Sequence, residues 1–277
     1  MVVRGFADPR RANPSQHLLD KDLADYLKLC KKQDPAPRPQ QALPSSTVLW
    51  IAHHFGGSPN PRLRTVANLI VVAFFFLLRV GEYTRSSDRR AKQTIPIRRQ
   101  DVKLWRNNQL LDHRLPFEEL ILADAVTIRL ENQKNGFKGA ILHHFASGRA
   151  LCPVRSAVLL VHPIAHLPRD TGLGTYISAD GAIRRVNAAE VRAAVQCGAV
   201  GDGLPSRGYD LDRIGSHSLR SGGATHLKLC GCDELTIMKL GRWSSNTYLR
   251  YIQTQIGELN RGLATKMARI LRFHNVS

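Results

Sequence analysis

The chain has 277 residues, 43% of them hydrophobic, and a formal net charge of +18 with a pI near 10.3. Its length and hydrophobic content are typical of a soluble globular protein with one core, and its longest apolar run, Leu69 to Leu78, is half as long as a membrane-spanning helix must be. The charge predicts a polyanionic partner, with nucleic acid as the first candidate, and favours no membrane association.

The amino-terminal segment is predicted to be an arm. Leu18 to Lys32 has leucines at helical intervals and predicts one short amphipathic helix. Residues 33–46 then contain four prolines, which resist helix and strand alike and predict a stiff tether. We therefore expect an arm with its tether at residues 1–44 and a main domain at residues 45–277. The amino terminus lacks the pattern of a secretory signal, so we expect an intracellular protein, in the nucleus of a eukaryote or in the cytoplasm and nucleoid of a bacterium.

Helices are predicted to open the main domain. Ser46 can cap a helix that runs to about His54, and Pro61 can begin a longer helix that continues through the apolar block toward Arg79. A small antiparallel sheet is predicted next, because apolar and polar residues alternate around Val102 and from Val126 to Glu131. Asn135-Gly136 then predicts a hairpin with its turn at about residues 134–139, followed by a strand at residues 140–145.

The pattern returns to helices after Cys152-Pro153. We expect these helices at residues 154–161, 188–196, 218–229, 235–240, 247–254 and 258–273. The predicted fold class is therefore α+β and mainly α-helical, with one small antiparallel sheet. The five cysteines lack the spacing of a zinc site or a disulfide framework, so we expect reduced, mostly buried thiols.

Four short segments contain candidate site residues. In the first, Arg79 emerges at the end of an apolar helix, either to meet an anion or to pair with Glu82 in a structural bridge. In the second, Lys134 stands near the hairpin turn, with Lys138 as a rival. Each of these features is weak evidence by itself, because most boundary arginines and turn lysines have no site role.

The third segment is Gly215 to Thr225, where Ser216 can cap a helix. His217 and Arg220 then project from the same face near the helix amino terminus, where a phosphate is favoured. Gly222 and Gly223 permit close approach of another backbone. In the fourth segment, Trp243 offers an indole N–H, and Tyr248 and Tyr251 follow it.

Taken in this order, the four segments resemble the tyrosine recombinase and phage-type integrase family, over roughly Leu77 to Ile252. Leu151 to Arg155 also resembles the segment that follows the sheet in that family. The resemblance implies a tyrosine recombinase catalytic domain that cleaves and rejoins double-stranded DNA through a 3′-phosphotyrosyl intermediate, in site-specific recombination, integration or transposition. It implies neither a metal nor another cofactor.

The resemblance also implies a role for each residue. Arg79 and Arg220 would stabilise the negative charge of the transition state, and His217 would assist proton movement at the tyrosine. Lys134 would protonate the departing 5′ oxygen, Trp243 would donate to a nonbridging oxygen, and Tyr251 would be the nucleophile.

Three features of the sequence depart from the family pattern. Tyr251 lies eight residues after Trp243, one fewer than the commonest spacing, and Tyr248 is a rival at a far shorter interval. Lys134 competes with Lys138. The amino-terminal arm resembles only a remnant of the family's core-binding domain.

The carboxy-terminal segment predicts an amphipathic helix, Glu258 to Phe273, which in the family often docks into a neighbouring protomer. We therefore expect a homotetramer on DNA, with packing of this helix on its own domain as the alternative. Two other functions remain open: a noncatalytic DNA-binding remnant of a mobile element, and a type IB topoisomerase-like enzyme.

Overall fold

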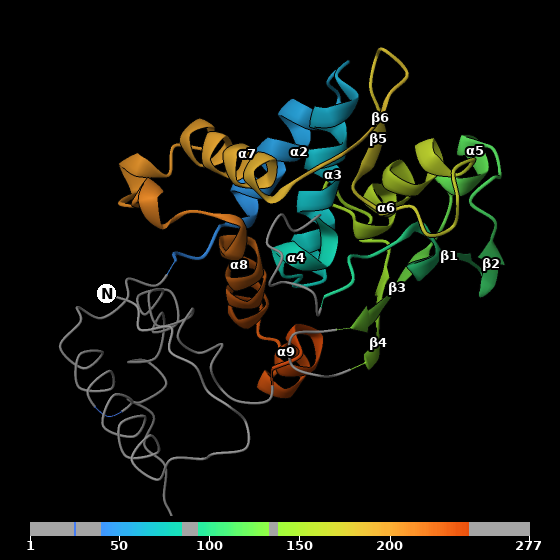
Figure 1. The fold of residues 1–277 in the computed structure, drawn as a ribbon. Coiled ribbons are helices and arrows are strands. Elements are labelled where there is room, and N and C mark those ends of the chain that lie inside the picture. Colours follow the sequence, from blue (N-terminus) through green and yellow to red (C-terminus); the bar gives the residue numbers. More distant parts are fainter. Residues whose placement is uncertain (1–24, 26–39, 85–93, 133–137, 244–277) are drawn as a thin grey trace, which may run out of the picture. The chain divides into compact units, whose positions relative to one another are not determined.

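The computed structural model describes residue 25 and residues 40–84, 94–132 and 138–243 (Figure 1). Contacts divide the chain into two units, Met1–Arg38 and Pro39–Ser277, and apart from the helical Asp25 the first unit lies outside the described residues. The predicted helices at residues 247–254 and 258–273 also lie outside them. Among the described residues, no helix combines the length and apolar character that crossing a membrane requires.

The described part is mainly helical with a small antiparallel sheet, as the sequence predicts. Its helices are α2 (Ser45–Gly56), α3 (Pro61–Phe75), α4 (Val80–Tyr83), α5 (Phe117–Leu120), α6 (Pro153–Val161), α7 (Ala188–Gly201), α8 (Ser216–Leu229) and α9 (Glu234–Gly241). Its strands are β1 (Val102–Arg106), β2 (Gln109–Leu111), β3 (Ala125–Asn132), β4 (Lys138–Phe145), β5 (Thr175–Ile177) and β6 (Ile183–Arg185).

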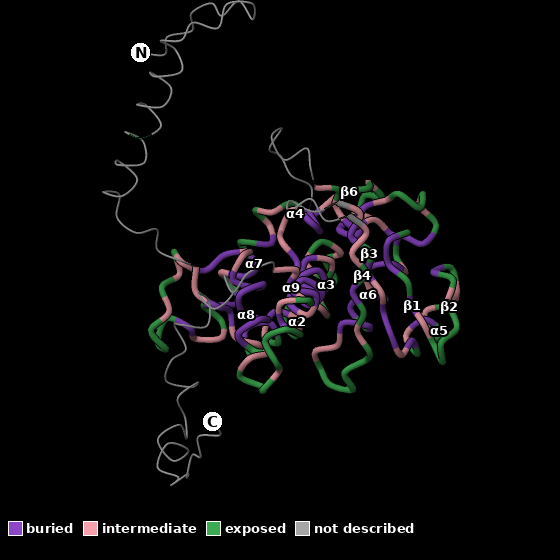
Figure 2. The backbone as a smooth tube through the Cα atoms, turned by 90° about the horizontal axis from the view of Figure 1, so that it is seen from below, coloured by how far each residue is buried: buried purple, intermediate pink, exposed green. Residues whose placement is uncertain are grey.

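Helix α3 is the centre of the core. The Asn60 side chain caps it by accepting a hydrogen bond from the Arg62 N–H, and Pro61 occupies its first turn. Its residues from Val66 to Phe74 are all buried, which is typical of a helix that is surrounded by other elements (Figure 2). Helices α2, α6, α7 and α8 pack against it.

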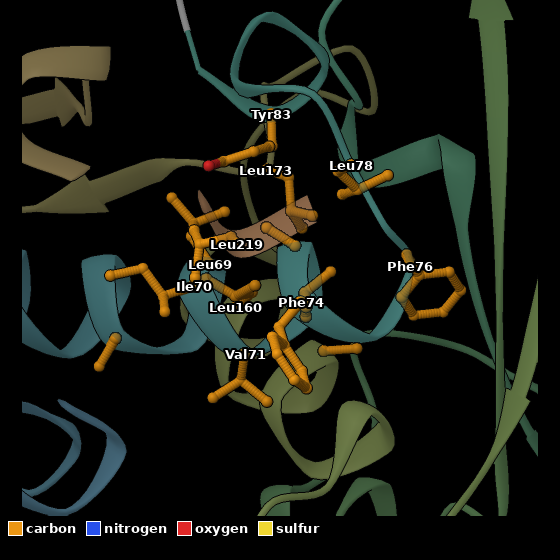
Figure 3. Packing of buried hydrophobic residues seen from close by; sticks show 14 of the residues in the cluster. Leu69, Ile70, Val71, Phe74, Phe76, Leu78, Tyr83, Leu160, Leu173 and Leu219 are labelled. Carbon is orange, nitrogen blue, oxygen red and sulfur yellow. The ribbon is translucent and has the colours of Figure 1, made fainter. Parts of the chain in front are cut away.

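Buried side chains from separate helices meet around α3. Leu69 of α3, Leu160 of α6 and Leu219 of α8 lie in one cluster (Figure 3). Full burial of one such leucine contributes about 1.5–3 kcal/mol of transfer free energy. This packing fixes the position of α8, the helix that contains His217 and Arg220.

The predicted sheet has four strands in the order β2-β1-β3-β4, and all its neighbouring pairs are antiparallel. Strands β5 and β6 form a second antiparallel sheet, which was not predicted. Val126 pairs with Leu104, Ile128 pairs with Leu142, and all four side chains are buried. Helix α6 packs on the sheet (Figure 1). The predicted hairpin is confirmed, but β4 begins at Lys138, which pairs with Asn132, so the turn is shorter than predicted.

Three predicted boundaries are wrong. Helix α2 begins at Ser45 after Pro44, and the Ser46 hydroxyl donates to Asp202 at 2.8 Å instead of capping the helix. Helix α3 ends at Phe75, before Arg79. The residue that precedes α8 is Gly215, so Ser216 is its first helical residue and not its cap.

The prediction of mostly buried cysteines is also wrong. Cys197 and Cys230 are exposed, and Cys152 and Cys232 are half-buried. None of these four described cysteines forms a disulfide. Cys152 and Cys232 pack against the hydrophobic clusters from their margins.

Candidate active site

The site begins where α3 ends. Leu77 has the left-handed conformation, with a φ of 48°, and the Leu78 N–H donates to the Ala73 carbonyl at 2.9 Å. This is the hydrogen bond of a Schellman motif, whose left-handed position glycine usually occupies. A leucine there costs about 1–2 kcal/mol, which its fully buried side chain offsets. The chain turns sharply as a result, and Arg79 becomes the residue that precedes α4.

Arg220 lies at the meeting point of three helices. It projects from α8 and is 1% exposed. Its guanidinium donates to the Leu77 carbonyl after α3 and to the Gly241 carbonyl at the end of α9. Helix carboxyl ends carry partial negative charge, so they stabilise a buried cation. The guanidinium also lies 4.3 Å from the centre of the Trp243 ring, a cation–π distance.

Glu82 joins two further arginines. Its carboxylate is buried and accepts from Arg79 Nη1 at 3.1 Å and from Arg242 Nη2 at 2.8 Å. Arg242 has the left-handed conformation, with a φ of 56°, and also donates to the Leu77 carbonyl at 3.2 Å. Burial is the main cause that lowers the pKa of Arg242, and the Glu82 carboxylate opposes this. The fold buries Arg242 and Glu82 together, in surroundings where either charge without the other would be costly.

His217 lies within electrostatic reach of both predicted site arginines. Burial lowers the pKa of its half-buried imidazole, and the positive charges of Arg220 and then Arg79 lower it further. Neutral imidazole is therefore favoured. Arg79 lies far from His217 and Arg220 in the sequence, and the fold brings it within electrostatic reach of His217. Arg242 connects the two predicted site arginines by contact, because it shares the Glu82 carboxylate with Arg79 and the Leu77 carbonyl with Arg220. The role of each residue stays a prediction.

The two glycines after Arg220 bring α8 close to its neighbours. A Cβ on Gly222 would lie 2.1 Å from the Leu43 carbonyl oxygen, and a Cβ on Gly223 would lie 2.5 Å from the Phe74 carbonyl oxygen. Both distances are far below van der Waals contact. The prediction that these glycines permit close approach of another backbone is confirmed.

The other predicted site residues divide into two groups. Trp243 is described, and its ring lies over Arg220 and against Gly241. Lys134, Tyr248 and Tyr251 lie outside the described residues. The rival lysine, Lys138, begins β4 rather than standing in the turn, and Lys134 falls between the paired residues Asn132 and Lys138.

Of the comparisons with known proteins, only the comparison with solved structures found matches. No protein-family model matches the chain, and no curated protein matches it either. Among solved structures, XerH site-specific recombinase bound to a palindromic difH substrate, in a post-cleavage complex, matches with a TM-score of 0.53 and 16% identity, over 85% of this chain and 56% of that one. The chain has the fold of a tyrosine recombinase catalytic domain. It spans little more than half the length of the XerH chain.

Two further solved structures match with lower TM-scores. XerA recombinase matches with a TM-score of 0.49 and 14% identity, over 86% of this chain and 67% of that one. The Tn1549 transposon integrase in complex with transposon right end DNA matches with a TM-score of 0.43 and 12% identity, over 82% of this chain and 68% of that one.

Arg242 was missed by sequence reasoning, and Glu82 was considered only as a structural partner of Arg79. The three-residue spacing from Arg79 to Glu82 is a usable signal, because it permits the Arg79 N–H to donate to the Glu82 carboxylate at 2.8 Å as α4 begins. Arg242 gives no comparable signal. Its partner Glu82 is 160 residues away, so only the folded chain reveals the ion pair.

Proposed function

We propose that this protein cleaves and rejoins DNA strands through a 3′-phosphotyrosyl intermediate. The observation that carries the proposal is that Arg79 and Arg220 both act electrostatically on His217, while Arg242 shares Glu82 with Arg79 and the Leu77 carbonyl with Arg220. The fold shared with the XerH recombinase supports it. The net charge of +18 supports a partner with many phosphates, because bound Lys and Arg side chains release counterions from DNA.

The two arginines would act on the charge that develops during cleavage. Attack on a phosphodiester gives a pentacoordinate phosphorus with additional negative charge on its nonbridging oxygens. Guanidinium groups match these oxygens in geometry and remain charged at every relevant pH. Preorganised positive charge of this kind is typically worth on the order of 10³-fold or more in rate. Arg220 needs little reorganisation, since the ends of α3 and α9 already hold it.

His217 would handle the proton of the nucleophile. A phenol with its ordinary pKa of about 10 is a poor nucleophile at neutral pH, so a nearby base assists. The lowered pKa of His217 favours the neutral imidazole, which can accept that proton. Trp243 would donate its indole N–H to a nonbridging oxygen while its ring rests on Arg220.

Tyr251 and Lys134 would complete the reaction. The Tyr251 oxygen forms a bond to phosphorus, and the bond from phosphorus to the 5′ oxygen breaks. Lys134 donates a proton to that oxygen, which leaves as a 5′ hydroxyl. The phosphotyrosine conserves the energy of the broken bond, so a 5′ hydroxyl can reverse the step and rejoin the strand. We further propose that segment 258–273 joins protomers into a tetramer on DNA.

Trapping of the covalent intermediate tests the proposal. The full chain is incubated with a library of randomised duplexes, each carrying a nick so that the cleaved fragment diffuses away. A protein–DNA adduct that survives denaturation is expected for the unchanged protein and for Tyr248→Phe, whereas Tyr251→Phe should give none. Loss of the adduct in Tyr248→Phe alone would assign the nucleophile to Tyr248 instead.

One observation favours a second function, noncatalytic DNA binding. Arg79 and Arg220 both have partners within the protein, namely Glu82 and the carbonyls of Leu77 and Gly241, and these contacts serve the fold without any reaction. Salt-sensitive binding to the same library with no adduct from any duplex would establish this function and refute the cleavage proposal.

A further inference from the structure

A hollow lined by cationic side chains lies beside β2, at the edge of the sheet opposite β4. We call it the Arg99 pocket. It has a volume of about 330 Å³, and its charged and polar lining includes Arg99, Lys103, Asp112, His113 and Arg169. No predicted catalytic residue lines it. This space is large enough for a tetrahedral anion together with waters.

Arg99 is buried without a paired carboxylate. It is 6% exposed, and its Nη2 donates to the Leu167 carbonyl at 3.0 Å. Its Nε has no hydrogen-bond partner among the described residues. The adjacent Arg98 differs, because it pairs with Asp101 at 2.9 Å and with Glu131. A buried guanidinium with an unsatisfied donor is costly unless an anion completes its contacts.

The surroundings of Arg99 are positive. Burial lowers its pKa, and the charges of Arg114 and Arg169 lower it further, while Asp112 opposes them. His113 adds no charge at neutral pH, because burial and the nearby Arg99 lower its pKa to about 4. Asp112 accepts a hydrogen bond from the Arg114 N–H at 3.0 Å and is one carboxylate among several cations. The pocket therefore has a surplus of positive charge.

We propose that the Arg99 pocket binds a phosphate group. A guanidinium can donate to two oxygens of one phosphate, and Arg99, Arg169 and Lys103 all line the pocket. The phosphate belongs either to a DNA backbone or to a small phosphorylated molecule. The proposal stands apart from DNA cleavage, because it concerns a pocket that the cleavage residues do not line.

Calorimetric titration of the full chain with inorganic phosphate, at constant ionic strength set with chloride, tests it. An Arg79→Gln background weakens phosphate binding at the candidate active site. In this background, one saturable phosphate site is expected to remain, in the Arg99 pocket. Adding Arg169→Gln should weaken this site about tenfold or more. Arg169 is exposed, so the substitution leaves the core intact.

Arg149→Gln in the same background is the matched control. It removes the same charge from an exposed loop residue that does not line the pocket, and should change the phosphate affinity less than twofold. Equal phosphate affinity in the Arg169→Gln and Arg149→Gln proteins would overturn the proposal. Absence of saturable binding in the Arg79→Gln background would overturn it as well.

The salt dependence of duplex binding then distinguishes the two sources of phosphate. If the group belongs to DNA, Arg169→Gln should reduce the slope of log K against log salt by about one, and Arg149→Gln serves as the reference. If calorimetry finds the site and both variants have the same slope, the ligand is a small phosphorylated molecule.

Discussion

Glu82 is a buried carboxylate shared by two guanidinium groups, and its charge compensates the buried Arg242 and the half-buried Arg79. Glu82→Gln retains the shape but removes the charge that compensates both arginines. We expect the free energy of unfolding to fall by about 3–5 kcal/mol, measured by chemical denaturation.

Asp180→Asn is the comparison for this substitution. It removes the carboxylate of an exposed ion pair with Arg184 and should leave the denaturation midpoint almost unchanged, because exposed pairs are screened by solvent. Equal shifts in the two variants would contradict a special role for burial at Glu82.

The buried His113 makes stability depend on pH. The folded protein holds its pKa near 4, whereas the unfolded chain has the ordinary value of 6.5. The unfolded state therefore binds the proton more readily, so this contribution is complete above pH 6.5 and is lost as the pH falls toward 4. The loss is roughly 3 kcal/mol, from 1.36 kcal/mol per pKa unit.

Denaturation of the wild type and of His113→Gln at pH 7, 5.5 and 4 measures this effect. His144 and His217 also have lowered pKa values, so both proteins lose stability on acidification. The decline should be shallower in His113→Gln. Parallel curves for the two proteins would show that His113 titrates alike in the folded and unfolded states.

At the scale of elements, Gly222 brings α8 close to the backbone of the segment before α2. Gly222→Ala would place a Cβ 2.1 Å from the Leu43 carbonyl oxygen, and backbone cannot move aside as a flexible side chain does. We expect a loss of at least about 3 kcal/mol, the upper part of the range for overpacking. Thermal unfolding would measure it. Gly56→Ala, where a Cβ meets nothing within 4 Å, should be neutral or slightly stabilising.

The sequence predicted the elements that have a clear period and missed those that are too short to have one. Strand β3 alternates from Val126 to Glu131, β4 follows the Asn135-Gly136 turn signal, and α6 to α9 have apolar residues at helical intervals. Strands β5 and β6 have three residues each, less than two periods of alternation. The end of α3 was missed for a different reason. Apolar residues continue through Leu78, and no glycine or proline stands at the turn to indicate the end of the helix. The left-handed residue is Leu77.

The candidate site was predictable to the extent that its residues stand in short local motifs. Arg79, His217, Arg220 and Trp243 were each found from neighbours within a few positions. The hydrogen bonds from Arg220 to the carbonyls of Leu77 and Gly241 were not predictable, because every residue has a backbone carbonyl and its identity does not show which one accepts. The Arg99 pocket was also beyond prediction, because its cations are spread over some 70 residues of sequence.

For the whole molecule, the net charge of +18 predicts how DNA binding responds to salt. If the protein contacts about 6–10 phosphates, its affinity for duplex DNA should fall on the order of 10³ to 10⁵-fold between 50 and 200 mM salt. Fluorescence anisotropy with a labelled duplex would measure the slope. Affinity that stays constant over this interval would rule out a predominantly electrostatic interface.

Because Arg220 ties together the ends of α3 and α9, the fold gains from it whether or not DNA is cut. A related chain without the proposed cleavage activity would still keep that arginine in order to remain folded. When related chains are compared, an intact arginine is therefore compatible with loss of cleavage, and the tyrosine is the position to inspect first.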